Sequence, residues 1–180
     1  MMHLFFNRSL TTGFYIGIVA SVILLTTNFA PSQLSQMVCY MVFSLGVYIG
    51  QRKYNAEIIK IEKQEQKVVS TNKYWHYVWY GTVAGIGASI IISLFMVLYI
   101  KFNNPEFGAE TIEMSQKYIE KWNIYSDIEL EQIKSMMHKI FIPSLIVSNI
   151  ISYTFLSFMF SLVGAWLTKK YNNTFNNNNN

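Results

Sequence analysis

Three polar residues lie close together in residues 140–168, the longest stretch of the sequence without a charged side chain. Asn149 is the most polar of them, and Ser148 and Ser152 lie on either side of it. An asparagine inside a membrane can form a hydrogen bond between helices, worth about 1 kcal/mol. The alternative is that the three residues line a polar path for a solute. The sequence leaves both interpretations open.

The residue types that usually carry out catalysis or bind metals are scattered along the chain. Cys39 is the single cysteine, so we expect neither an intramolecular disulfide nor a cysteine-rich metal site. His76 and His138 have no metal-ligand spacing around them, although acids lie near His138. The sequence contains no phosphate-binding glycine loop, nucleophile elbow or zinc-protease helix. We therefore expect a non-enzymatic protein without catalytic residues, cofactor or metal.

Four windows without Asp, Glu, Lys or Arg determine the expected fold class. They cover residues 10–30, 34–51, 74–100 and 140–168. A helix needs about 20 apolar residues to cross a hydrocarbon core of roughly 30 Å. The windows predict an all-α membrane protein with four transmembrane helices in one domain, residues 1–172. A cleaved signal peptide is the alternative for the first window, but "NFAPSQ" lacks a small-x-small cleavage site.

The distribution of basic residues predicts the orientation in the membrane. With a cytoplasmic N-terminus, nine Lys and Arg residues fall on the cytoplasmic side and five on the other side. Lys and Arg favour the cytoplasmic side of a membrane. We therefore expect a multi-pass protein of the bacterial inner (cytoplasmic) membrane with both termini in the cytoplasm. The net charge of +4 is not gathered into a basic patch with exposed aromatic residues, so nucleic-acid binding is not expected.

Small residues recur at helical spacing in all four windows. Lipid gives apolar side chains no solvent-driven reason to associate, so helices in a membrane must pack closely through small residues. We expect a tight bundle. The predicted helix-packing residues are Gly13, Gly17, Gly46, Gly50, Gly81, Gly85, Ser157, Ser161 and Ala165.

Two pairs of segments resemble each other along the chain. "GFYIGIVASVIL" from Gly13 matches "GTVAGIGASIII" from Gly81 at six of twelve positions. "FSLGVYIGQRKYN" from Phe43 similarly matches "FSLVGAWLTKKYN" from Phe160. The similarity predicts a helical hairpin duplicated in tandem, with both copies in the same orientation, as in parallel-repeat membrane proteins.

The connections between the windows differ in character. After Arg52 a helical pattern continues toward "STN" at residues 70–72, which predicts that the second span extends into the cytoplasm. Residues 102–139 form an insertion between the third and fourth spans, and we expect two amphipathic helices there that lie across the outer face of the bundle. "SDIE" from Ser126 fits a capping box. Pro143 is expected in the first turn of the fourth span or at a kink.

The C-terminal segment, residues 173–180, consists mainly of asparagine. Such low-complexity segments do not supply apolar side chains for a packed core. We expect it to be disordered.

Five segments carry a resemblance to a known family. They are "GFYIGIVAS", "LGVYIGQRKY", "YGTVAGIGAS", "NPE" and "SDIELEQI". On these segments the chain resembles an uncharacterised family of four-span integral membrane proteins from Bacteroidetes, classed as a domain of unknown function. The resemblance covers roughly residues 11–171, and the chain departs from the family at "KQEQKVVSTNK", where a Gly-rich loop is expected. It implies a membrane location and a helical architecture, and it implies no activity.

Two functional hypotheses follow from the sequence. The first is a membrane protein that acts through protein contacts as a subunit or assembly factor, with the lipid bilayer and either a membrane-protein partner or a homo-oligomer as its partners. It rests on the close-packing residues and the amphipathic connections. The alternative is a small transporter or channel with a polar path near Asn149.

Overall fold

The computed structural model describes residues 2–26, 33–65, 74–121 and 126–177, and all of its regular structure is helical. The helices are α1 (Met2–Thr26), α2 (Gln33–Gln64), α3 (Tyr74–Phe102), α4 (Phe107–Glu120) and α5 (Asp127–Asn177). No strand occurs in these described residues. The predicted all-α class is confirmed.

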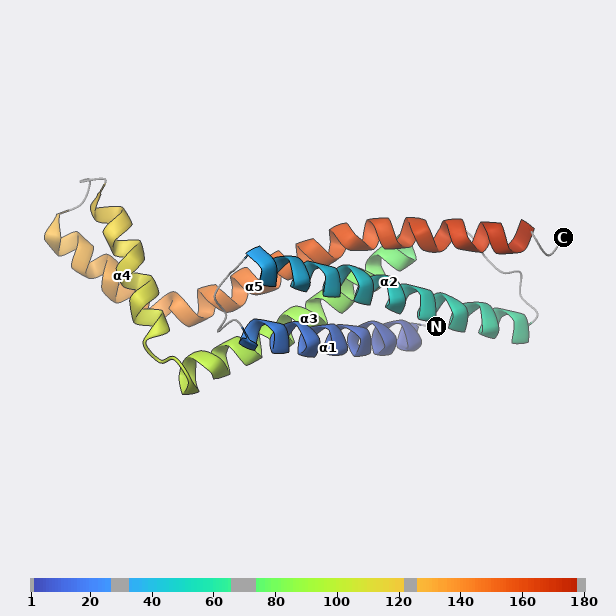
Figure 1. Cartoon of the computed structure of the whole chain (residues 1–180), viewed down its shortest axis with the longest axis horizontal. Helices are drawn as coiled ribbons and strands as arrows, with labels where there is room; N and C mark the ends of the chain where they lie inside the picture. The colour runs from blue at the N-terminus through green and yellow to red at the C-terminus, as the bar shows by residue number, and fades with distance from the viewer. Residues whose placement is uncertain (1, 27–32, 66–73, 122–125, 178–180) are drawn as a thin grey trace.

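Helices α1, α2, α3 and α5 form an elongated bundle (Figure 1). Residue contacts give their directions. Gly13 and Gly17 of α1 meet Ala84 and Ala88 of α3 in the same order, so these two helices are parallel. The start of α1 and the end of α5 lie at one end of the bundle, which we call the terminal end (Figure 1).

The other helix pairs complete two hairpins of like orientation. Gly81 and Gly85 of α3 meet Ser161 and Ser157 of α5 in reverse order, so α3 and α5 are antiparallel. Ile16 and Thr12 of α1 meet Gly46 and Gly50 of α2 in reverse order, so α1 and α2 are antiparallel as well. These directions agree with a tandem hairpin, whereas the duplication itself stays a prediction.

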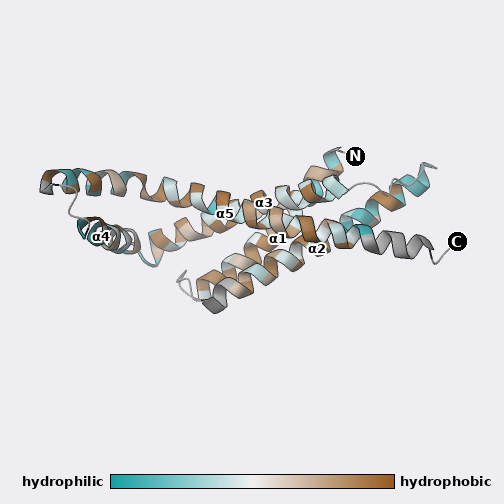
Figure 2. Cartoon of the chain, turned by 90° about the horizontal axis from the view of Figure 1, so that it is seen from above, coloured by the Kyte–Doolittle hydropathy of each residue, from teal (hydrophilic) through white to brown (hydrophobic). Residues whose placement is uncertain are grey.

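Three helices in the described residues are long and apolar enough to cross a membrane, not four. They are α1, α3 and the part of α5 from Ile128 to Lys169. The predicted span at residues 34–51 is not among them, so this measure supports three of the four predicted spans. The physical reason is the short apolar run of α2, which ends at Gln51, Arg52 and Lys53. Figure 2 shows the change from hydrophobic to hydrophilic colour along this helix.

Two apolar clusters hold the bundle together. The central cluster consists of Ile16, Ala20, Phe43, Val47, Ala88 and Ile92. The cluster at the terminal end, which we call the terminal-end cluster, consists of Phe5, Tyr54, Ile58, Tyr77, Val78, Tyr80 and Ala165. Each cluster combines residues from at least three helices, so it fixes the relative positions of both hairpins.

The outer insertion forms an arm that projects beyond the bundle (Figure 1). The arm consists of α4 and of the first part of α5, residues 127–139, and α4 packs against α5. We expected two separate amphipathic helices lying across the bundle. The second one instead continues into the predicted fourth span without a break. Pro143 lies inside this continuous α5 and does not end the helix. Membrane helices tolerate proline where local adjustments satisfy the freed carbonyl.

The start of α5 shows one half of the predicted capping box. The backbone N–H and the hydroxyl of Ser126 both donate to Oε2 of Glu129, each at 2.8 Å. The carbonyl of Ser126 accepts from the backbone of Leu130 at 3.0 Å. The Glu129 carboxylate thus accepts from the backbone N–H of the N-cap residue, which is one half of a capping box.

Two predicted boundaries meet the limits of the described residues. Helix α2 continues past Arg52 to Gln64, as expected for an extended second span, while "STN" at residues 70–72 lies outside the described residues. Helix α5 continues to Asn177 and so enters the segment 173–180 that we predicted to be disordered. Extending an existing helix adds one hydrogen bond per residue, which favours such a continuation.

Candidate functional site

The predicted small residues on α1 lie where its backbone approaches α3 most closely. A Cβ added at Gly17 would lie 2.7 Å from Cβ of Ile91 and 2.9 Å from the carbonyl oxygen of Ala88. At Gly13 it would overlap the carbonyl oxygen of Ala84. Such backbone neighbours cannot rotate away. The crossing of α1 and α3 therefore depends on the absence of side chains at residues 13 and 17.

The same kind of contact joins α3 to α5. A Cβ at Gly85 would lie 2.6 Å from the Ser157 hydroxyl oxygen, and one at Gly81 would meet Ser161. The Ser157 hydroxyl donates to the carbonyl oxygen of Gly81 at 2.7 Å. Ser157, Ser161 and Ala165 are completely buried. These small residues thus combine close approach with a hydrogen bond between helices.

On α2, Gly46 and Gly50 face α1. An added Cβ would lie 2.6 Å from Cγ1 of Ile16 at the first glycine and 2.6 Å from Cγ2 of Thr12 at the second. All nine predicted packing residues therefore lie at contacts between helices.

Gln51 is a central polar residue that the sequence analysis did not single out. Its side chain is completely buried, and its Nε2 donates to the backbone oxygens of Tyr77 at 2.9 Å and Ser161 at 3.3 Å. Gln51 therefore joins α2 to both helices of the other hairpin. Its Oε1 lies against Gly164 and has no hydrogen-bond partner among the described residues.

Hydrogen bonds between helices continue around the terminal-end cluster. The hydroxyl of Tyr80 donates to the carbonyl oxygen of Arg8 at 3.0 Å and lies 2.7 Å from Oγ1 of Thr12. The Tyr54 hydroxyl and Nε2 of His76 share a hydrogen bond of 2.6 Å. His76 is therefore engaged in packing between α2 and α3.

Two further polar contacts join helices near this cluster. The hydroxyl of Tyr77 donates to the side-chain oxygen of Asn55. Arg8 forms an ion pair with Glu57 at 2.7 Å, and both side chains are partly exposed. Asn55 lies four residues after Gln51 on the same helix face, so the spacing of polar residues after the apolar run of α2 is a signal for the Tyr77 contact.

The polar residues predicted to line a path do not meet in the interior. Ser148 and Ser152 are exposed on α5. Asn149 is partly buried, and its Nδ2 donates to the Met96 sulfur atom on α3 at 3.3 Å. The structure therefore separates Asn149 from its two serine neighbours and places it in a contact between helices.

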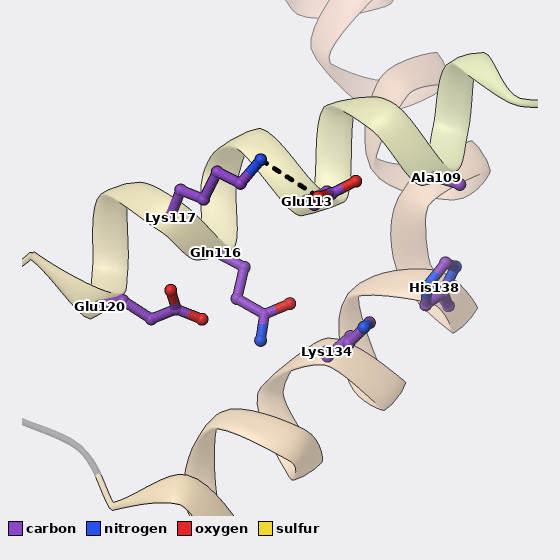
Figure 3. Close-up of a pocket in the computed structure, with 7 residues that line it drawn as sticks. All are labelled: Ala109, Glu113, Gln116, Lys117, Glu120, Lys134 and His138. Atoms are coloured by element: carbon purple, nitrogen blue, oxygen red, sulfur yellow. Dashed lines mark ion pairs between the residues drawn. The ribbon is translucent and has the colours of Figure 1, made fainter.

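A polar cleft of about 330 Å³ lies between the two halves of the arm (Figure 3). Glu113, Gln116, Lys117 and Glu120 of α4 line one side, and Lys134 and His138 of α5 line the other, with Ala109 also in the lining. Figure 3 shows the ion pair of Glu113 with Lys117, whose charged atoms are 3.1 Å apart. His138 belongs to no group of three potential metal ligands in the part of the chain that the structure describes.

The arm also exposes apolar side chains on two separate stripes. On α4 the stripe contains Met114 and Tyr118, with exposed fractions of 65% and 69%. On α5 it contains Ile128 and Met136, with exposed fractions of 73% and 60%. The α5 stripe follows four-residue spacing through Gln132, so its members share one helix face.

Comparisons with family models, curated proteins and solved structures find no match to this chain, so its resemblance to the four-span family stays a prediction.

Proposed function

We propose that the chain is a non-enzymatic bacterial inner-membrane protein that acts through protein contacts, as a subunit or assembly factor. The observation that carries the proposal is the α5 stripe of the arm, Ile128 and Met136. Exposed apolar residues on a projecting helical segment are typical of surfaces that bind another protein. The four-helix bundle serves as the anchor that holds this surface at the membrane.

The proposal includes an orientation. We propose that α2 crosses the membrane with the other bundle helices, because it runs antiparallel along α1 and contacts both α3 and α5. Both termini then lie on the cytoplasmic side and the arm lies outside. The larger number of Lys and Arg residues on the terminal side supports this orientation.

The partner can be tested by gentle extraction into lipid nanodiscs followed by native mass measurement. We expect a foreign subunit at fixed stoichiometry with the wild-type chain. Replacing Ile128 and Met136 together by serine removes the apolar surface without touching the bundle, so the foreign subunit should be lost. Glu131→Ala is the matched control, because it changes an exposed residue of the same helical segment. Wild-type complexes without any foreign subunit would refute the proposal.

A further inference from the structure

We propose that the exposed stripe of α4 binds the same stripe of a second copy of this chain, with the two α4 helices antiparallel. The stripe consists of Glu110, Met114, Tyr118 and Lys121, which are all exposed. Their spacing of four, four and three residues places them on one face of the helix. The face has an acid at one end, a base at the other and two large apolar residues between them.

This order of residues is self-complementary. When two copies of α4 lie antiparallel with Glu110 near Lys121 of the second copy, Met114 lies within one residue of the position opposite Tyr118 of that copy. A two-fold axis relates the two copies, so each of these contacts occurs twice in the interface, as in an isologous dimer. The pairs combine opposite charges with contacts between a methionine sulfur and an aromatic ring, which are favourable.

The orientation of α4 in the fold fits this arrangement. Figure 1 shows α4 running across the long axis of the bundle, and Figure 2, turned by 90°, shows it nearly end-on. Two copies inserted the same way in one membrane can be related by a two-fold axis along the membrane normal. A helix that lies across such an axis pairs with its mate in antiparallel orientation. The position of α4 across the two-fold axis therefore gives the antiparallel direction that the pairing of Glu110 with Lys121 requires.

The remaining charged groups of α4 do not oppose the pairing. Glu113 and Lys117 form an ion pair with each other, and together with Glu120 they line the cleft that faces α5 (Figure 3). The Lys121 ammonium lies 5.3 Å from the ring centre of Tyr118, so the basic end of the stripe is directly beside its aromatic residue.

The contact should be reversible. A single helix of 14 residues offers a small surface, and small interfaces in solution are weak. Anchoring both copies in one membrane restricts their orientation and raises their effective concentration. Association should therefore increase with the density of the protein in the membrane.

The test uses the full chain, fluorescently labelled and reconstituted into phosphatidylcholine vesicles at a series of protein-to-lipid ratios. Single-molecule photobleaching counts the copies per complex. We expect wild-type dimers whose fraction rises with density. Glu110→Lys and Lys121→Glu should each weaken dimerisation about tenfold, since each places like charges opposite one another twice. The double variant with both changes should restore the wild-type dimer, and Glu131→Lys, on the α5 segment, should leave it unchanged.

Three outcomes would overturn the proposal. Wild-type monomers at every density would mean that lipid or solvent covers the stripe. Dimers that tolerate each single reversal would place the interface elsewhere. Single variants that dissociate without recovery in the double variant would exclude the antiparallel pairing. The copy number is measured in the absence of any other protein, so this result is independent of whether a foreign subunit binds the α5 stripe.

Discussion

The side chain of Gln51 on α2 occupies the space that a side chain at residue 164 of α5 would need. A Cβ added at Gly164 would overlap Oε1 of Gln51, whose Nε2 is held by the carbonyl oxygens of Tyr77 and Ser161. The carboxamide is therefore fixed on one side by hydrogen bonds and on the other by the α5 backbone. The position of the buried Gln51 side chain therefore depends on the absence of a side chain at residue 164.

This dependence predicts a non-additive pair of substitutions. Gly164→Ala should lower the free energy of unfolding by about 2 kcal/mol, because overpacking a filled core site forces side chains or backbone to shift. In a Gln51→Ala background the same change should cost little, since the space is already open. Reversible unfolding in bicelles would measure the four proteins of the cycle.

Gly87→Ala is the control for this cycle. A Cβ at Gly87 would have its nearest neighbours at 3.6 Å, which is ordinary van der Waals contact. We expect no loss of stability there. Equal costs of Gly164→Ala with and without Gln51 would contradict the coupling.

The parts of this fold that follow simple physical limits could be predicted from the sequence. A charged side chain in hydrocarbon is costly, so the charge-free windows located α1, α3 and the membrane part of α5. Close packing in lipid requires small residues, so Gly13 and Gly17 could be singled out before their contacts with α3 were known.

The central polar contacts could not be predicted in this way. Gln51 marked the end of an apolar window, yet it lies completely buried at a contact between three helices. Its partners are backbone carbonyl groups, which every residue has, so the pattern of side chains does not predict them. On α5, by contrast, the helical spacing of the polar residues does predict which of them face the bundle. Asn149 is in phase with the buried Ser157, whereas Ser148 and Ser152 are one position out of phase and are exposed.

A second prediction concerns the crossing of α1 and α3. Gly13→Ala would push a methyl group into the carbonyl of Ala84, and a backbone atom cannot move away by changing rotamer. The two helices would have to separate. We expect a loss of about 2–3 kcal/mol in unfolding free energy, larger than the loss for Gly46→Ala, whose neighbour is the flexible side chain of Ile16. Equal effects of the two changes would argue against a backbone contact at Gly13.

A third prediction concerns pH and the start of α5. Hydrogen bonds from the backbone N–H and then the hydroxyl of Ser126 lower the pKa of the Glu129 carboxyl below its ordinary value of 4.5. Because the folded pKa is lowered, the capping contribution is present above the unfolded pKa and is lost as the pH falls through the folded pKa. A carbon-detected NMR titration of Glu129 should show this low pKa.

Ser126→Ala separates the two hydrogen bonds. The substitution removes the hydroxyl but keeps the backbone N–H, which is the larger cause of the shift. The pKa of Glu129 should therefore rise in the variant and still remain below 4.5. An ordinary pKa in the wild-type chain would show that the capping contacts do not form in the membrane-bound protein.

The last prediction separates packing from transport at Asn149. Its side chain donates to the Met96 sulfur, a weak acceptor, while Ser148 and Ser152 face outward. Asn149→Leu should therefore change the unfolding free energy by less than about 1 kcal/mol. Solute and ion flux through proteoliposomes should stay at the wild-type level, because the substituted group contacts α3 and does not join the serines in a polar lining. Ser148→Leu, at an exposed neighbouring position, is the matched control. A change of flux in Asn149→Leu that Ser148→Leu does not reproduce would favour the transporter or channel, since it would require a hydrated path at a position where the structure has a contact between helices.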